Sequence, residues 1–239
     1  QGVNYRIPEP AGLRNIVTED EKVTITLMPA VGTAIIYSLD GSDPNVKSPK
    51  QYSAPIDITL KPGEIKTLKT RVISAAGLMS AVYMATIIRG KMLPAVEASG
   101  KTAGVKYSLY VPSNAYGQDT VPITGETKSI GIEQFVNRID PKQIWGVSFE
   151  GFVNAPVDAI YEFQIDSTND RQLTIDDQTL IDEAGTKDRA VTSTLVPLRA
   201  GWHKISMHYD HREGEPYWRV RWAIKGQNWR NLGGSELVH

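Results

Sequence analysis

The chain has 239 residues and a formal net charge of −1, with 26 basic and 27 acidic side chains. This balance provides no overall positive field that would collect nucleic acid or an anionic membrane surface, and no run approaches the ~18–20 apolar residues of a membrane-spanning helix. The sequence contains no cysteine, which excludes disulfides, thiolate metal sites and a cysteine nucleophile.

Short apolar or alternating runs recur along the whole chain, and Gly, Pro, Asn or Asp residues separate them. The runs lie at 23–28, 33–39, 68–75, 81–88, 145–153, 159–166, 171–176, 202–209 and 218–224. Runs of about four to eight residues that are rich in Val, Ile, Thr and Tyr and bounded by turn residues are typical of a β-sandwich or barrel. No window keeps a helical apolar period beyond about two turns, and only 129–144 has room for a short turn of helix. We therefore predict an all-β chain.

A boundary between two domains is expected near residues 90–97. The string Gly-Lys-Met-Leu-Pro at 90–94 follows the apolar run 81–88, and a stretch of low hydrophobicity, EASGKTAG, comes next. A chain of this length is long enough for two domains with a core each. We place the first domain at 1–93 and the second at 94–239, which predicts two β-sandwich domains in tandem.

The first domain carries the string YSLDGSDP at 37–44, followed by Tyr52 and by Pro55-Ile56. Its Asp-Gly and Asp-Pro pairs predict a tight turn, because glycine accepts positive φ and aspartate side chains accept hydrogen bonds from nearby backbone N–H groups. The whole pattern resembles the small β-sandwich at the C-terminal end of chitobiases and β-hexosaminidases, over roughly residues 15–90. In that family the motif shapes a turn and implies no catalytic duty.

The opening string GVNYRIPEP at 2–10 stands directly before this sandwich. It resembles the exit sequence after the catalytic barrel of bacterial family-20 glycoside hydrolases, the β-N-acetylhexosaminidases. The resemblance implies that the partner of the first domain is an upstream catalytic barrel of the same polypeptide.

The second domain contains a series of strand-like strings with polar turns between them. They are VSFEGFV (147–153), IYEFQID (160–166), LTID (173–176), LID (180–182), LRAGWHKI (198–205) and WRVRWAI (218–224). Strict alternation in the last string puts Trp218, Val220 and Trp222 on one face of a strand and the two arginines between them on the other. The series resembles the protective-antigen-type sandwich, a lectin-like module of bacterial glycosidases and yeast adhesins, over about 140–238 and more weakly over 100–140.

The sequence offers no catalytic constellation. The hexosaminidase resemblance implies an adjacent Asp-Glu pair after a His-x-Gly-Gly stretch, and this motif is absent from the sequence. The pairs Asp182-Glu183 and Glu19-Asp20 lie in extended segments, where neighbouring side chains point to opposite faces. We expect no catalytic residue in this chain and a glycoside hydrolase as the parent protein.

Two strings of the sequence are candidate metal sites. In the string from His208 to His211 (HYDH), two imidazoles and Asp210 could hold zinc, but the following REGEP favours a solvated hairpin loop. Calcium arises from the adhesin resemblance, which implies two consecutive aspartates in the turn after the Y-x-F strand. That position reads Asn169-Asp170, and an amide in place of a carboxylate weakens a site for a hard cation. We therefore expect no cofactor. Calcium is the one ion that the resemblance suggests as an alternative.

Tryptophan side chains are the other candidates for binding sugar rings. We expect Trp218 and Trp222 to lie in the core, whereas Trp229 stands in the polar loop KGQNWRNLGG and is either an exposed platform or a ring tucked against the sheet. Asp176-Asp177 is expected to cap the next turn. The candidate carbohydrate-binding residues are Asn169, Asp170 and Trp229, and the expected ligands are glycans that contain N-acetylhexosamine.

These observations predict a non-catalytic accessory segment of a secreted or periplasmic β-N-acetylhexosaminidase, which braces the catalytic barrel and has glycan binding as a second role. The alternatives are a stand-alone carbohydrate-binding or adhesion module and a structural spacer or dimerisation element. The parent protein is expected in the periplasm or at the cell surface, with no nucleic-acid partner and no membrane span.

Overall fold

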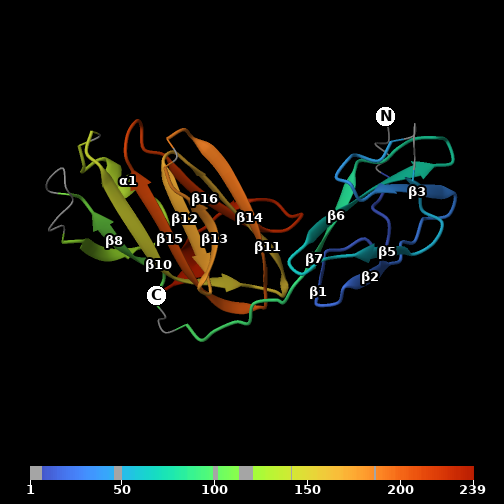
Figure 1. The fold of residues 1–239 in the computed structure, drawn as a ribbon, viewed down its shortest axis with the longest axis horizontal. Coiled ribbons are helices and arrows are strands. Elements are labelled where there is room, and N and C mark those ends of the chain that lie inside the picture. Colours follow the sequence, from blue (N-terminus) through green and yellow to red (C-terminus); the bar gives the residue numbers. More distant parts are fainter. Residues whose placement is uncertain (1–6, 46–49, 99–101, 113–120, 141, 186) are drawn as a thin grey trace, which may run out of the picture. The chain divides into compact units, whose positions relative to one another are not determined.

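The computed structural model describes residues 7–45, 50–98, 102–112, 121–140, 142–185 and 187–239 (Figure 1). The chain divides into two compact units, Gln1–Lys91 and Met92–His239, whereas the sequence placed the boundary after residue 93. The residues just after the division attach to the second unit, because the N–H of Leu93 donates to the carbonyl of Pro197 and that of Val96 to the carbonyl of Trp202. Among the described residues, no helix is long and apolar enough to cross a membrane.

The prediction of an all-β chain is confirmed in both units. The strands of the first unit are β1 (Ile16–Thr18), β2 (Lys22–Ile25), β3 (Thr33–Ser38), β4 (Lys50–Gln51), β5 (Ile56–Thr59), β6 (Ile65–Ser74) and β7 (Tyr83–Arg89). One sheet has the order β1-β7-β6-β3-β4, in which β1 runs parallel to β7, and β2 pairs with β5 in a second sheet. Alternation places Ile56 and Ile58 of β5 in the core between the sheets, beside Leu68 and Ile87.

The second unit holds most of the chain and begins with β8 (Val105–Tyr110). It continues with β9 (Ile123–Thr127), α1 (Glu133–Val136), β10 (Trp145–Ala155), β11 (Ala159–Ser167), β12 (Asp170–Ile175), β13 (Gln178–Glu183), β14 (Ala190–Leu198), β15 (Gly201–His211), β16 (Trp218–Ile224), β17 (Arg230–Asn231), the 3₁₀ turn η1 (Gly234–Glu236) and β18 (Leu237–Val238). Its larger sheet has the order β13-β12-β15-β10-β8-β9, with β18 paired to β10, and its smaller sheet has the order β14-β11-β16-β17.

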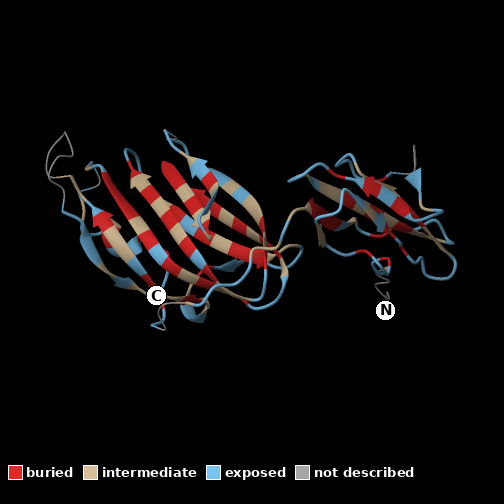
Figure 2. Cartoon of the chain, turned by 60° about the horizontal axis from the view of Figure 1, so that its bottom comes forward, coloured by how far each residue is buried: buried red, intermediate tan, exposed pale blue. Residues whose placement is uncertain are grey.

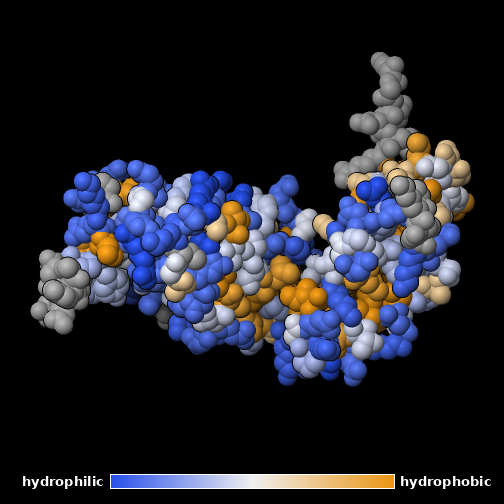
Figure 3. Space-filling model, turned by 45° about the horizontal axis from the view of Figure 1, so that its top comes forward, coloured by the Kyte–Doolittle hydropathy of each residue, from blue (hydrophilic) through white to orange (hydrophobic). Residues whose placement is uncertain are grey.

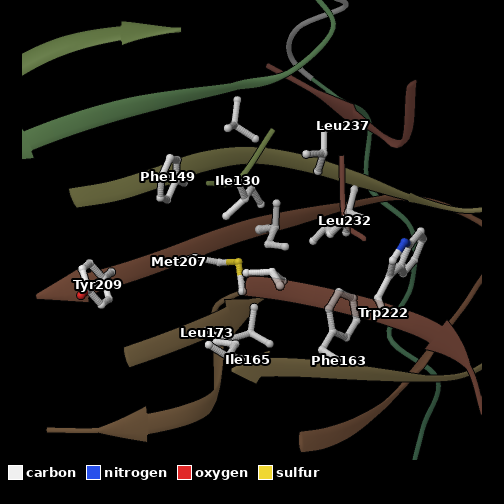
Figure 4. Close-up of a cluster of buried hydrophobic side chains, with 14 of the residues drawn as sticks. Ile130, Phe149, Phe163, Ile165, Leu173, Met207, Tyr209, Trp222, Leu232 and Leu237 are labelled. Atoms are coloured by element: carbon white, nitrogen blue, oxygen red, sulfur yellow. The ribbon is translucent and has the colours of Figure 1, made fainter. Parts of the chain in front are cut away.

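The inner faces of these two sheets form one hydrophobic core, which includes Phe149, Phe163, Met207 and Trp222 (Figure 4). Along the long strands, buried and less buried residues alternate, as expected for antiparallel sheets with one face toward solvent (Figure 2). Trp218 and Trp222 are 4% and 0% exposed, which confirms the prediction that both belong to the core.

Candidate functional site

Asn169, the residue at the expected calcium position, lies in the turn between β11 and β12 and is completely buried. Its backbone φ of 60° is in the left-handed region, which asparagine tolerates better than most residues. Its side-chain carbonyl accepts hydrogen bonds from the N–H groups of Arg212 and Glu213, and its amide donates to the carbonyl of Glu213 at 3.0 Å. The side chain therefore fastens this turn to the loop between β15 and β16.

Asp170 follows in β12 and is 4% exposed. Its carboxylate forms an ion pair with the guanidinium of Arg212, with 2.5 Å between Oδ2 and Nη2. A calcium ion needs roughly six to eight oxygen ligands, but here the amide oxygen is engaged by backbone donors and the carboxylate by a cation. Among the described residues, no cluster of three His, Asp or Glu side chains could hold a metal ion. The residues at this position do not fit calcium.

Thr168 extends the same fastening toward the start of β16. Its backbone N–H donates to the carbonyl of Tyr217, and its hydroxyl accepts the N–H of Tyr217 and donates to the carbonyl of Glu215. Together with Asn169, this threonine fixes the β15–β16 loop, residues 212–217, through its backbone. The turn that resembled a calcium site therefore holds the β15–β16 loop in place through hydrogen bonds. We call Thr168 and Asn169 the bracket of this loop.

The zinc alternative fails on the geometry of β15. β15 continues through His211, and the loop expected at REGEP follows directly after it, at residues 212–216. Successive side chains of a strand alternate between faces, so His208 points outward while His211 is completely buried beside Trp145, with 5.7 Å between ring centroids. The two imidazoles are on opposite sides of the sheet.

Asp176 and Asp177 form the two-residue turn between β12 and β13, with φ values of 46° and 64°. Positive φ at both positions is characteristic of the tight turns that suit twisted hairpins. One carboxylate oxygen of Asp176 accepts the backbone N–H of Lys204 at 2.8 Å, and the other pairs with Nδ1 of His203 at 2.6 Å. Asp176 therefore accepts a backbone N–H of β15 and not one of its own turn, and the carboxylate of Asp177 pairs with Nζ of Lys204 at 3.0 Å.

Trp229 lies between β16 and β17 and is partly exposed. The guanidinium of Arg221 is 5.7 Å from the centroid of its ring. One side of the ring thus contacts a cation of β16, and the rest is partly open to solvent. This arrangement lies between the exposed platform and the ring tucked against the sheet that the sequence left as alternatives. It lies on a different element from Asn169 and Asp170, and no contact joins these candidates among the described interactions.

A cross-strand contact between Ser148 of β10 and His208 of β15 was not expected from the sequence. The serine hydroxyl is 2.9 Å from Nδ1 of His208, and Nε2 of the same ring is 3.0 Å from Asp210. Gly146 makes room for this carboxylate, since a Cβ there would lie 2.2 Å from it. The hydrogen bond from His208 lowers the pKa of Asp210, and burial partly opposes that shift.

These three residue types also form hydrolase triads, which need hydrogen-bond donors for the developing oxyanion. Ser148 lies inside β10, which pairs with β8 on one side and β15 on the other. The neighbouring backbone N–H groups therefore belong to the two ladders and do not face the hydroxyl. We interpret the cluster as a structural network on the outer face of the sheet.

A cleft of about 360 Å³ opens where β16 begins, between the β15–β16 loop and α1. It is lined by Ile132, Glu133, Val136, Pro216, Tyr217, Trp218, Arg219 and Asn231. The sequence did not predict it, because the segments 132–136 and 216–219, whose nearest residues are 80 positions apart, meet only in the folded chain. The bracket of Thr168 and Asn169 fixes one wall of this cleft.

Arg189 supports the same wall. Its guanidinium lies 3.7 Å from the centroid of the Tyr217 ring and donates two hydrogen bonds to Asp166, at 2.8 and 2.7 Å. These bonds lower the pKa of Asp166, against the opposing effect of burial. A planar guanidinium suits both contacts, the stacking and the bidentate pair.

The lowered pKa of Asp166 predicts a pH-dependent contribution to stability. Since the folded-state pKa lies below the unfolded value of about 3.9, the ionised carboxylate stabilises the fold above that value, and the contribution is lost as the pH falls through the folded-state pKa. We expect Asp166→Asn to lower the free energy of unfolding by about 1–2 kcal/mol at neutral pH, because Arg189 is half exposed. Urea unfolding as a function of pH should show this difference shrinking toward zero in acid. A difference that stayed constant to the lowest pH would contradict the assignment.

Comparison with known proteins gives two family matches in tandem. The model of the chitobiase/β-hexosaminidase C-terminal domain matches residues 14–84, and that of the PA14 domain matches residues 101–230. The second match therefore begins earlier than the region in which the sequence resemblance was strong. Both matches confirm the resemblance to the non-catalytic C-terminal region of β-hexosaminidases.

A curated relative is the β-hexosaminidase of Porphyromonas gingivalis, which is 26% identical over 251 residues. The match covers 95% of this chain but only 30% of the relative. Similar solved structures include the PA14 sugar-binding domain of an RTX adhesin (12% identity, 58% of this chain, 99% of that chain, TM-score 0.47) and an anti-sigma factor domain-containing protein from Clostridium clariflavum (18% identity, 95% of this chain, 82% of that chain, TM-score 0.49). Because the PA14 domain model matches more than half of its residues, the chain belongs to the PA14 domain family.

Proposed function

We propose that this chain is a non-catalytic accessory segment of a secreted or periplasmic β-N-acetylhexosaminidase, and that its second unit binds glycan. The observation that carries the proposal is the order of the two family matches, a β-hexosaminidase C-terminal domain followed by a PA14 domain. The chain covers only 30% of the related β-hexosaminidase. A parent protein of similar length therefore has room for a catalytic domain.

The side chains support a non-catalytic role. Asp182 and Glu183, the acidic pair of β13, diverge: Asp182 accepts a hydrogen bond from Gln172, and Glu183 pairs with Arg171. The hexosaminidase resemblance implies an adjacent Asp-Glu pair that acts together on one substrate, whereas neighbouring side chains of a strand point to opposite faces. In the described part of the chain, these two carboxylates serve strand pairing instead.

The first unit carries an apolar surface that suits docking on a catalytic domain. Met28, Val31, Leu78 and Met79 are exposed by 61%, 105%, 64% and 43%. The register of β3 with β6 pairs Thr33 with Ser74, so the loops that hold these side chains lie at the same end of the sheet. Figure 3 shows apolar residues on the surface of this unit. Exposed apolar patches of soluble domains mark interaction sites.

The first described residues of the chain, 7–11, lie beside this apolar surface, because they share a cleft with Met28. Residues 7–11 line a cleft of about 280 Å³ together with Met28 and Val72. A domain on the N-terminal side of residue 7 would therefore meet the apolar surface first. We assign the bracing role to this surface, with the catalytic domain of the parent protein as its occupant.

Hydrolysis of a chromogenic N-acetyl-β-glucosaminide tests this function. The parent protein should release the chromophore, whereas the isolated chain should release none. Val31→Asp with Leu78→Asp should lower the temperature at which the parent loses activity, and Met84→Asp, which replaces an exposed residue elsewhere on the unit, should not. Hydrolysis by the isolated chain, or a parent of another enzyme class, would overturn the proposal.

A further inference from the structure

The outer face of the smaller sheet of the second unit presents two neighbouring arginines. In β16, Arg219 and Arg221 alternate with residues of the core, so both guanidinium groups leave the strand on the side away from the core. Arg219 is exposed and Arg221 is partly exposed. A ligand in solvent can therefore approach both cations from the same side of the sheet.

The carboxylates on this face are already paired with other cations. The register of β11 with β16 places Asp166 opposite Arg219. Both oxygens of this carboxylate, however, accept hydrogen bonds from Arg189, at 2.8 and 2.7 Å. Glu162, the other carboxylate of β11, pairs with Lys225 at 2.9 Å. In the part of the chain that the structure describes, neither arginine of β16 forms an ion pair.

Neutral amides hold the two guanidinium groups in place. Nε of Arg219 donates to Oδ1 of Asn231 at 3.3 Å, and Nη2 of Arg221 donates to Oε1 of Gln164. An amide orients a guanidinium without neutralising it, and each guanidinium has five N–H donors. Nε of Arg221 is buried, but both Nη groups of the exposed Arg219 are left for a ligand. Such a planar pair of donors matches the two oxygens of a carboxylate or a sulfate.

An aromatic ring lies next to these cations. The indole of Trp229 is partly exposed, and the guanidinium of Arg221 is 5.7 Å from the centroid of the ring. The pairing of β16 with β17 brings Trp229 to the level of Ala223, the next outward position after Arg221. The face of an aromatic ring is electron-rich and attracts the C–H groups of a flat ligand. This side of the sheet therefore offers uncompensated positive charge and a stacking surface next to each other.

We propose that this face binds an acidic polysaccharide, with Arg219 and Arg221 on its anionic groups and Trp229 on a neighbouring sugar ring. A sulfate ester or a carboxylate of the polymer accepts from the Nη groups of Arg219, and Arg221 adds a second positive charge. A sugar ring packs its C–H groups on the indole, whereas the acidic side chains of a peptide have no flat face of this kind. The inference rests on the proposed glycan-binding role and adds a selectivity for negative charge.

Three polymers with one backbone test the proposal on the whole chain: dextran sulfate, carboxymethyl dextran and uncharged dextran of equal length. In isothermal titration at low ionic strength, at least one charged polymer should bind about tenfold or more tightly than dextran, because charged hydrogen bonds add to the packing of the ring. Its affinity should fall as the salt concentration rises from about 0.01 M to about 0.15 M, which shortens the Debye length from ~30 Å to ~8 Å. The tighter of the two charged polymers identifies the anionic group.

Matched variants locate the binding surface. Arg219→Gln with Arg221→Gln should weaken binding of the charged polymer at least about tenfold, because it removes both unpaired charges. Arg14→Gln with Lys106→Gln removes the same charge from two exposed positions outside this face, and it should bind like the unmodified chain. Trp229→Ala should weaken binding about threefold to tenfold through the loss of the stacking surface.

Circular dichroism checks that each variant is folded, and if the double arginine variant is not, the exposed Arg219→Gln alone should still weaken binding. Equal affinity for dextran and for both charged polymers, or arginine variants that bind like their control, would overturn the proposal. Poly-L-glutamate that binds as tightly as the charged dextrans, with no effect of Trp229→Ala, would also overturn it and assign the face to an acidic protein segment. If the parent protein hydrolyses the chromogenic substrate while this chain binds neither charged polymer, the accessory role stands and this inference fails.

Discussion

Replacing Trp222 by alanine is expected to lower the free energy of unfolding of the second unit by about 3–5 kcal/mol, the usual cost of truncating a large aromatic residue in a core. The ring is completely buried and stacks on Tyr161 with 5.3 Å between centroids. It also lies 5.7 Å from the ring of Phe163 and beneath the guanidinium of Arg230. The substitution leaves a cavity and deprives Glu236 of its indole partner.

This loss would be a large fraction of the roughly 5–15 kcal/mol by which a domain is stable. Chemical denaturation followed by circular dichroism should show a transition at lower denaturant concentration for the second unit. Trp229→Ala provides the matched control, because this ring is partly exposed and its removal should cost less than about 1 kcal/mol. Equal losses for the two variants would contradict the central place of Trp222 in the core.

Replacing Glu183 by alanine should lower the free energy of unfolding by about 2–4 kcal/mol, because it removes the partner of a buried cation. The Arg171 side chain is 2% exposed and donates to Glu183, while the other carboxylate oxygen accepts from the hydroxyl of Thr192 at 2.8 Å. The carboxylate thus joins β12 of the larger sheet to β14 of the smaller sheet. It is 33% exposed, so water offsets part of the loss.

Glu213→Ala is the control for this variant, since the Glu213 carboxylate is 55% exposed and its pair with Lys187 should contribute at most about 1 kcal/mol. The double replacement Arg171→Met with Glu183→Leu should recover much of the stability, because exchanging a buried pair for apolar residues removes the desolvation cost of both charges. Urea unfolding measures all three effects. A double variant as unstable as Glu183→Ala would contradict the explanation by an unpaired buried charge.

The strands and their inward faces could be predicted from local patterns. Alternation in 218–224 assigned Trp218 and Trp222 to the core and Arg219 to the outside. Because successive side chains of a strand point to opposite faces, burial of one face determines which residues are exposed. The turn at Asp176-Asp177 was equally local, because two consecutive residues with positive φ close the hairpin. The tandem of two sandwiches followed from such runs together with the family resemblances.

The surroundings of the candidate site residues could not be predicted in the same way. Whether Asn169 is a metal ligand or a buried bracket depends on the loop at 212–217, more than 40 residues away, and the position of Arg212 beside Asp170 exists only in the folded chain. His208 and His211 looked like one cluster, but β15 includes both residues and separates their side chains onto opposite faces. The contact of Ser148 with His208 depends on the register of β10 with β15.

By itself, the sequence determined most of the long strands and the faces they bury, because periodicity and turn chemistry act between near neighbours, but it did not reveal β14 (Ala190–Leu198). Its motifs indicated the family to which the chain belongs. Only the tertiary structure formed the cleft at the start of β16. The cleft at Trp218 draws its walls from α1, from the β15–β16 loop and from β17, and no property of any one of these segments marks it as part of a site. Burial decided which polar groups find partners. When the β15–β16 loop packs on the sheet, Asn169 accepts hydrogen bonds from backbone N–H groups of that loop, whereas the indole N–H of Trp218 has no partner among the described residues. The residue types alone predict neither result.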